Sequence, residues 1–258
     1  MARRRMPLLR SLAAMAALSF AGPALAQTPS TLRIGLADDA DALDPTLSRT
    51  YVGRIVFAGL CDKLFDIDQK LNIVPQLATG YEYPDPQTLV IKLRAGVTFH
   101  DGEKLDSAAV KASLERHQTL QGSTRRGEIN AIDRVETPDP LTVRIVLKSP
   151  SSPLIIQLTD RAGMVMSPKA MAALGADFGK APVCAGPFKF AERIPQDRIV
   201  LDRFDGYWNK ATRSRERRRS SRRRRTAAAS ACRAGGDRIA RRGTPAPRAR
   251  RGGGLDPR

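Results

Sequence analysis

Histidine is the first residue type to consider for chemistry, and the chain has only two histidines, His100 and His117. His100 stands beside Asp101 in the stretch Phe-His-Asp-Gly at 99–102, a pair that could relay a proton or help to bind a metal ion. No pair of carboxylates at ligand spacing stands beside either histidine. Asp101-Gly102 is also a strong turn dipeptide, so we interpret the stretch as structural, with Phe99 packed inside and His100 facing outward. We therefore expect no metal site, no cofactor and no catalytic residue.

The three cysteines, Cys61, Cys184 and Cys232, are an odd number. Exported proteins usually pair their cysteines in disulfides. No histidine lies near Cys61 or Cys184 in the sequence, so we expect neither to act as a nucleophile. The chain also lacks the Gly-x-x-x-x-Gly-Lys-Ser/Thr loop of nucleotide-hydrolysing enzymes. An enzyme is thus the class of function with the least support.

The strong positive charge of the chain belongs to its two ends. The formal net charge is +18, from 44 Lys and Arg residues against 26 Asp and Glu residues. Four of the bases lie in residues 1–26, and 17 arginines against three acids lie in residues 211–258. Residues 27–210 therefore carry 23 bases and 23 acids. The basic composition therefore comes from the two ends and gives no evidence for a basic face on the neutral body.

The first 26 residues have the three-part pattern of a secretory signal. An arginine-rich start is followed by an apolar run from Leu12 to Phe20, then by Gly22-Pro23 and small residues up to Ala26. This pattern predicts cleavage after Ala26 and export of the mature chain. The alternative is an uncleaved membrane anchor, but the apolar run is too short to span a bilayer as a stable helix.

Residues 27–210 contain interleaved strands and helices without a regular βαβ repeat. Alternating apolar residues predict strands, and Pro-Asp-Pro or Asp-Gln sequences predict the turns between them. The expected strand regions are 31–37, 64–74, 80–94, 135–147, 185–190 and 198–204. In the first of these, Leu32, Ile34 and Leu36 share one side, and in 80–94 the same spacing holds for Leu89, Ile91 and Leu93.

Four helices are expected from their capping residues. Thr50 would cap a helix over 51–60 that buries Tyr51, Ile55 and Val56, and Gly175 would end a helix that starts after Ser167. The other two would start near Asp106 or Ser107 and near Ser151 or Ser152, the last running over 153–160. In the stretch Ser-Leu-Glu-Arg at 113–116, we expect Leu114 to be buried and Glu115 and Arg116 to be solvated.

Three ordered blocks resemble the family-5 extracellular solute-binding proteins, the substrate-binding components of peptide- and nickel-type ABC importers. The first block is LNIVPQLATGYEYPDPQTLVIKLRAGVTFHDGEKLDSAAVKASLER at 71–116. The second is PVCAGPFKF at 182–190, and the third is RIVLDRFDGYWNK at 198–210. The agreement in order and spacing runs from about residue 31 to 210 and stands behind a secretory signal.

The resemblance implies an α/β fold of the periplasmic-binding-protein type (type II), with two lobes that close around a small solute. Only the first lobe, with an inserted subdomain over roughly 48–165, is expected in this chain. The resemblance also implies a periplasmic location, an ABC permease complex in the inner membrane as partner, and a monomer. Di- or oligopeptides are the expected ligand class, with nickel complexes, opines and sugars as alternatives.

The resemblance places the ligand pocket beside two loops of the first lobe. Free carboxylates in the first loop could receive a cationic group, and a glycine in the second would allow close backbone approach. The candidates are Asp39, Asp41, Asp44, Cys184, Ala185 and Gly186. The alternative for each acid is that it only solvates a loop.

The resemblance also favours a disulfide between Cys61 and Cys184, because relatives often carry glycine at the second position and both lie on the hinge side of the first lobe. Such a bridge would close a loop of more than 100 residues and would contribute about 4–5 kcal/mol through chain entropy. The alternative is two separate buried thiols. Cys232 would stay unpaired.

The tail over 211–258 departs from the family pattern. It has 17 arginines and no lysine, and Ile239 and Leu255 are its only large aliphatic residues. A segment of this composition cannot bury enough apolar area to fold, so we expect it to be disordered. An out-of-frame translation of GC-rich DNA explains the mixture of Arg, Ala, Gly and Pro, and the product would then bind solute poorly or not at all. The alternatives are a solvated linker or a secreted basic nucleic-acid-binding protein that uses the arginines.

Overall fold

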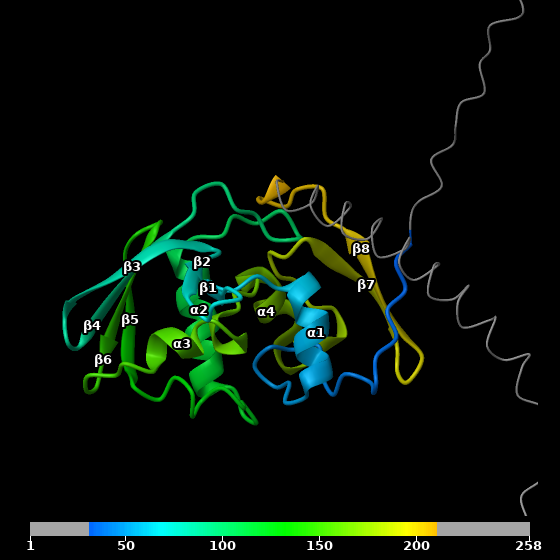
Figure 1. Ribbon diagram of the computed structural model, residues 1–258, viewed down its shortest axis with the longest axis horizontal. Helices are drawn as coiled ribbons and strands as arrows, with labels where there is room; N and C mark the ends of the chain where they lie inside the picture. Colours follow the sequence, from blue (N-terminus) through cyan, green and yellow to red (C-terminus); the bar gives the residue numbers. More distant parts are fainter. Residues whose placement is uncertain (1–30, 211–258) are drawn as a thin grey trace, which may run out of the picture. The chain divides into compact units, whose positions relative to one another are not determined.

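The computed structural model describes residues 31–210 (Figure 1). The expected signal segment 1–26 and the arginine-rich tail 211–258 lie outside the described residues. The elements follow one another in a mixed order, as the sequence predicts. Among the described residues, no helix is long and apolar enough to cross a membrane.

Residues 78–147 contain a four-stranded antiparallel sheet. Its strands are β3 (Ala78–Asp85), β4 (Thr88–Leu93), β5 (Ile132–Asp139) and β6 (Thr142–Leu147), in the spatial order β3-β4-β6-β5. The expected alternation in β4 is confirmed, because Leu89, Ile91 and Leu93 are all buried. Helix α2 (Ser107–Thr119) packs on β5 and β6 (Figure 1), and the Asp106 carboxylate caps it by accepting from the Ala109 amide.

Helix α1 (Tyr51–Leu60) starts as predicted but buries a different face. The Thr50 hydroxyl accepts a hydrogen bond from the Gly53 amide and caps the helix. Its buried residues are Gly53, Val56, Phe57 and Leu60. The predicted burial of Tyr51 and Ile55 is wrong, since both are exposed. The i, i+3, i+4 pattern that decides the core face runs through the later residues Val56, Phe57 and Leu60.

Two hairpins complete the strands. Strands β1 (Phe65–Ile67) and β2 (Ile73–Pro75) pair around the expected turn after Asp68, and β7 (Phe188–Ile194) pairs with β8 (Arg198–Arg203). The second hairpin packs on α1 (Figure 1). Phe190 and Leu201 pack against the core cluster that contains Phe57 and Leu60 of that helix.

Short helical segments connect the sheet to the second hairpin. These are α3 (Leu154–Gln157), the 3-10 turn η1 (Arg161–Gly163), α4 (Pro168–Leu174) and the 3-10 turn η2 (Gly175–Lys180). Ser167 caps α4 and Gly175 ends it, as predicted. The helix expected over 153–160 is shorter than predicted, since it has no side-chain cap and ends at Gln157.

The strand predicted over 31–37 is wrong. Residues 31–36 form neither strand nor helix, and Leu32 and Ile34 are each about two-thirds exposed, at 66% and 67%. A strand needs a neighbour to satisfy its backbone groups, and no described residue pairs with this segment. The alternation of apolar residues is thus not sufficient for a strand here.

The buried face of β4 predicts a contrast between two isoleucines. Replacing Ile91, fully buried in the sheet core, by alanine should lower the free energy of unfolding by about 2–5 kcal/mol, because a cavity remains. The matched control is Ile156→Ala, since Ile156 is 56% exposed and should change stability little. Urea unfolding of both variants checks this, and equal midpoints would contradict the assigned core.

Candidate functional site

The acidic loop that precedes α1 is tied down by its own carboxylates. Asp41 accepts hydrogen bonds from the Arg49 amide (2.6 Å), the Thr50 hydroxyl (2.8 Å) and the Ser48 hydroxyl (3.0 Å). Partial burial raises the pKa of Asp41, but these hydrogen bonds outweigh it and lower the pKa to about 2. Asp41 is therefore ionised at neutral pH and already holds the turn that leads into α1.

Asp44 is the most buried of the three predicted acids. Its side chain is 1% exposed and forms a bidentate ion pair with the Arg116 guanidinium of α2. The two guanidinium nitrogens donate to Oδ1 and Oδ2 of Asp44, at 2.9 and 2.7 Å. Arg116 also donates to the Thr46 hydroxyl (2.6 Å) and to the Gly175 carbonyl (3.1 Å). The prediction that Arg116 is solvated is wrong, because its side chain is 10% exposed. A planar guanidinium donates two parallel hydrogen bonds to a carboxylate in this geometry.

A buried histidine supports the same loop. The Thr46 hydroxyl lies 2.9 Å from Nδ1 of His117, which is completely buried. Burial disfavours the charged imidazolium and lowers the pKa of His117 to about 3. His117 is therefore neutral at any physiological pH.

Asp39 joins the loop to the second hairpin. Its carboxylate accepts from the Gln196 amide and from the Arg193 guanidinium, each at 3.0 Å. The hydrogen bond from the Gln196 amide is the main reason that the pKa of Asp39 is lowered, and the hydrogen bond from Arg193 lowers it further. The expectation of free carboxylates is thus wrong for Asp39, Asp41 and Asp44, since each already has a partner.

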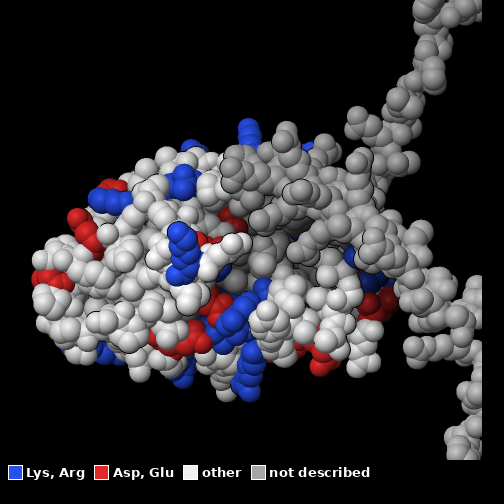
Figure 2. Space-filling view, in the orientation of Figure 1, with Lys and Arg blue, Asp and Glu red and all other residues white. Residues whose placement is uncertain are grey.

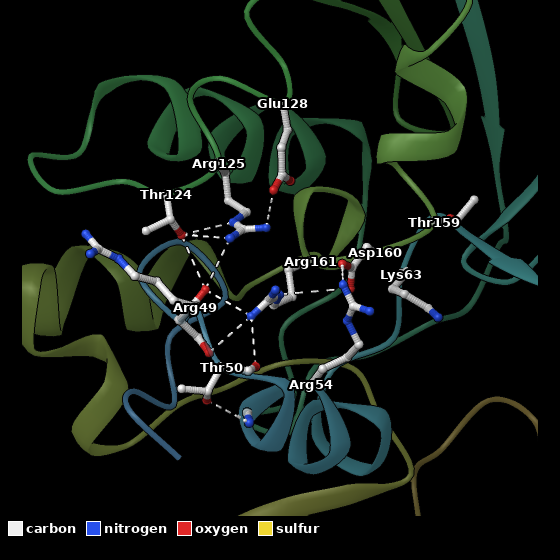
Figure 3. A network of polar contacts seen from close by, with 12 residues as sticks. Arg49, Thr50, Arg54, Lys63, Thr124, Arg125, Glu128, Thr159, Asp160 and Arg161 are labelled. Atoms are coloured by element: carbon white, nitrogen blue, oxygen red, sulfur yellow. Dashed lines mark hydrogen bonds and ion pairs between the residues drawn. The ribbon is translucent and has the colours of Figure 1, made fainter. Parts of the chain in front are cut away.

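A network of arginines that the sequence did not indicate surrounds the turn at 48–50 (Figure 3). Arg125 and Arg161 point toward the same backbone, and both donate to the Ser48 carbonyl, at 3.2 and 3.0 Å. Arg161 also donates to the Thr50 carbonyl at 3.2 Å. Both residues are buried, with Arg125 4% and Arg161 6% exposed.

Two carboxylates offset part of this positive charge. Arg54 of α1 pairs with Asp160, and Arg125 pairs with Glu128. Asp41, which accepts from the Ser48 and Thr50 hydroxyls of the same turn, is the third carboxylate of the network. The three guanidiniums are therefore matched by three carboxylates. Burial is the main reason that the pKa of Arg161 is lowered, and the positive charge of Arg125 lowers it further. Figure 2 shows basic and acidic side chains side by side across the middle of the visible face.

The second predicted loop contains the disulfide. Cys61, which ends α1, and Cys184 are joined with their sulfurs 2.01 Å apart, and both are buried. This is the pair that the resemblance favoured. Gly186 packs so closely that an added Cβ would lie 2.5 Å from the backbone of Leu60. A glycine is thus required there for packing inside the lobe.

His100 does not face outward, contrary to prediction. Its Nε2 lies 3.1 Å from the Gly186 carbonyl, its Nδ1 accepts from the Cys184 amide at 3.3 Å, and its ring meets Phe204 edge-on. Burial is the main reason that the pKa of His100 is lowered. His100 therefore braces the 184–186 loop, as a structural side chain.

Two open hollows lie on the described surface. One, of about 440 Å³, lies between α2 and α4 and includes Arg116 and Met171 in its wall. The other, of about 190 Å³, lies beside His100, Val183 and Lys189. No group of three His, Cys, Asp or Glu residues in 31–210 could hold a metal ion.

The Asp44–Arg116 pair predicts a strong effect of one substitution. Arg116→Ala leaves the Asp44 carboxylate buried without a partner and should lower the free energy of unfolding by about 3–5 kcal/mol. The matched control is Arg134→Ala, because Arg134 pairs with Asp133 and Glu136 at the exposed surface and should matter little. Thermal unfolding of both variants at neutral pH is the measurement, and an equal loss in the two would refute the assignment.

The disulfide predicts a loss of stability when it is removed. Its cysteines are separated by 123 positions, so replacing both by alanine should cost about 4–5 kcal/mol through the entropy of the unfolded chain. Cys232→Ala serves as the control and should leave the unfolding midpoint unchanged. A double variant as stable as the parent chain would show that the bridge does not constrain the fold.

Comparison with known proteins identifies the relatives of this chain. Residues 72–238 match the family model of the bacterial extracellular solute-binding proteins, family 5. The match passes Lys210, where the sequence suggested that the resemblance ends. The glutathione-binding protein GsiB of Pectobacterium atrosepticum is 31% identical over 198 residues, and that of Salmonella paratyphi A is 34% identical over 190. The chain spans about 38% of the length of the first of these relatives and 37% of the second.

Solved structures agree in fold. The protein AgaA of A. tumefaciens R10, in complex with agropinic acid, is 35% identical with a TM-score of 0.62, covering 67% of this chain and 35% of AgaA. A nickel ABC transporter protein of Bacillus halodurans is 33% identical with a TM-score of 0.58, covering 66% of this chain and 34% of that one. OppA of Burkholderia pseudomallei is 21% identical and supports the fold alone. The described residues therefore form part of a periplasmic-binding-protein fold, and the chain belongs to the bacterial extracellular solute-binding proteins of family 5.

Proposed function

We propose that this chain derives from the substrate-binding component of an ABC importer that captures a di- or oligopeptide-like solute in the periplasm and delivers it to an inner-membrane permease. The observation that carries the proposal is the family match over residues 72–238. One relative is named a glutathione-binding protein, and another was solved in complex with agropinic acid. These names support a small organic molecule with carboxylate groups as the solute.

The polar network at the start of α1 supports an anionic group on that solute. Arg54 is the accessible member, with a side chain 49% exposed. The N-terminus of a helix itself favours negative charge. A ligand carboxylate would pair with the exposed guanidinium of Arg54 near this end of α1. Arg125 and Arg161 would act indirectly, by fixing the turn at 48–50.

The proposed mechanism is closure of two lobes around the solute, with the polar groups of this lobe already hydrogen-bonded before the ligand arrives. Ligand that contacts two lobes favours their closed arrangement by its higher affinity for that state. The loops at Asp39–Asp44 and Cys184–Gly186 would form part of one wall. Because their side chains are engaged, they would offer backbone groups and shape to the ligand.

Export and partners complete the proposal. The segment 1–26 would direct the chain to the periplasm and be removed after Ala26, and the mature chain would be a monomer. The neutral composition of 27–210 favours a solute-binding function over nucleic-acid binding.

The proposal is tested by calorimetric titration of residues 27–258 with glutathione and tripeptides, and with the same peptides amidated at the C-terminus. We expect weak, millimolar binding, because the described hollows are open, and an at least ~10-fold preference for the free carboxylate, equal to about 1.4 kcal/mol. Arg54→Ala should remove this preference, whereas Arg134→Ala should keep it. The GsiB protein of Salmonella paratyphi A serves as the positive control. Equal binding of the acids and the amides would contradict the proposal.

A further inference from the structure

The buried carboxylate of Asp62 holds the segment that follows the β7–β8 hairpin. Asp62 comes directly after the disulfide cysteine Cys61 and is 2% exposed. Its Oδ2 accepts a hydrogen bond from the indole nitrogen of Trp208 at 2.8 Å. The side chain of Tyr207, which is 6% exposed, also forms a hydrogen bond to this carboxylate. Two consecutive side chains of the segment are thus bound at one buried point.

Two further groups keep this contact in place. The Gln76 amide donates to Oδ1 of Asp62 at 3.1 Å, and the Gln76 oxygen accepts from the Lys63 amide at 2.8 Å, which fixes the carboxylate from its other side. The Arg94 guanidinium lies 4.2 Å from the centre of the Trp208 ring, and the ring also packs against the apolar core of the sheet. The indole is therefore held both by its N–H group and by its face.

The segment 204–208 depends on side-chain contacts of this kind, because it forms neither strand nor helix. At its start, the Phe204 amide donates to the Pro187 carbonyl at 3.0 Å. At its end lie the two hydrogen bonds to Asp62. The segment follows directly on β8, whose last residue is Arg203. What holds the segment therefore also holds the end of β8.

We propose that Asp62 acts as a clasp, which keeps the end of β8 paired with β7 and protects the peptide bond after Arg203 from proteases that cleave after basic residues. The Arg203 side chain is 57% exposed and would be a cleavage site in an unpaired strand. A two-stranded hairpin is only marginally stable by itself, so the end of β8 needs a further contact. The proposal goes beyond solute capture and concerns where proteolysis of this chain stops.

Hydrolysis at Arg203 requires local opening, because a protease binds several residues of extended chain on each side of the bond across which water is added. The rate of cleavage then follows the population of the opened form. Opening at this bond moves Tyr207 and Trp208 away from Asp62, and a buried carboxylate that loses its donors is costly. The clasp thus makes the opened form rare. The 17 arginines of 211–258, by contrast, stand in a composition that predicts no folded core.

Digestion of the full chain with trypsin at pH 8, followed by mass spectrometry, tests the clasp. Burial raises the pKa of Asp62 to about 6, so the carboxylate is ionised under these conditions. In the parent chain we expect rapid cleavage within 211–258 and slow cleavage after Arg203 and after Arg144, which lies in β6. Trp208→Phe removes the N–H donor but keeps an aromatic ring, and Asp62→Ala removes the acceptor. Each should raise the cleavage rate after Arg203 roughly 10-fold or more, without changing the rate after Arg144.

The matched control is Asp66→Ala, which removes a neighbouring carboxylate that is 45% exposed and should leave both cleavage rates unchanged. Three results would overturn the clasp. The first is cleavage after Arg203 in the parent chain as fast as within 211–258. The second is an unchanged rate after Arg203 in both variants, and the third is an equal acceleration after Arg144 in both.

Hydrogen exchange gives a second readout, which needs no protease. The Phe204 amide should exchange roughly 10-fold faster or more in Trp208→Phe, whereas the amides of β4 and β6 keep their protection. Unchanged exchange at Phe204 would contradict the clasp. Both readouts involve no solute, so they fail or succeed independently of the proposed transport function.

Discussion

The ion pair between Asp44 and Arg116 is the contact on which the arrangement of this lobe depends. It joins a loop without regular structure to the last turn of α2, across 72 positions of sequence. Because both groups are largely buried, each is stable in place only while the other is present. The loop in turn supplies Thr46, which meets His117, and the backbone that leads to the cap of α1.

The same principle extends around the turn at 48–50. The Ser48 carbonyl accepts from Arg125 and Arg161, and Asp41 accepts from the other side of the turn. One apolar core includes the buried residues of the four-stranded sheet, and a second includes both cysteines of the disulfide. The turn at 48–50 is already hydrogen-bonded by charged side chains and is therefore preorganised, so a ligand does not need to order it.

Much of the fold could be predicted from local patterns. The hairpin turns, the caps Thr50, Asp106 and Ser167, and the period-two core of β4 depend on neighbours in sequence, and all agree with the structure. The predictions that were wrong depend on distant partners. Residues 31–36 alternate like a strand but have no pairing segment among the described residues, and Arg116 looks solvated until Asp44 is placed beside it. His100 likewise turns inward because the 184–186 backbone offers it hydrogen bonds. Of the candidate site, the sequence indicated the two loops but not their engaged side chains or the arginines around them, since no local signal marks an arginine that bonds to backbone far away.

The central claim is that the buried pair holds the turn that opens α1. Hydrogen exchange measured by NMR on Arg116→Met tests it most directly, because the amides of Thr46, Leu47 and Ser48 all bond to Asp44. The account predicts that these amides lose protection while the β4 and β6 amides keep theirs. Unchanged protection at 46–48 would contradict it.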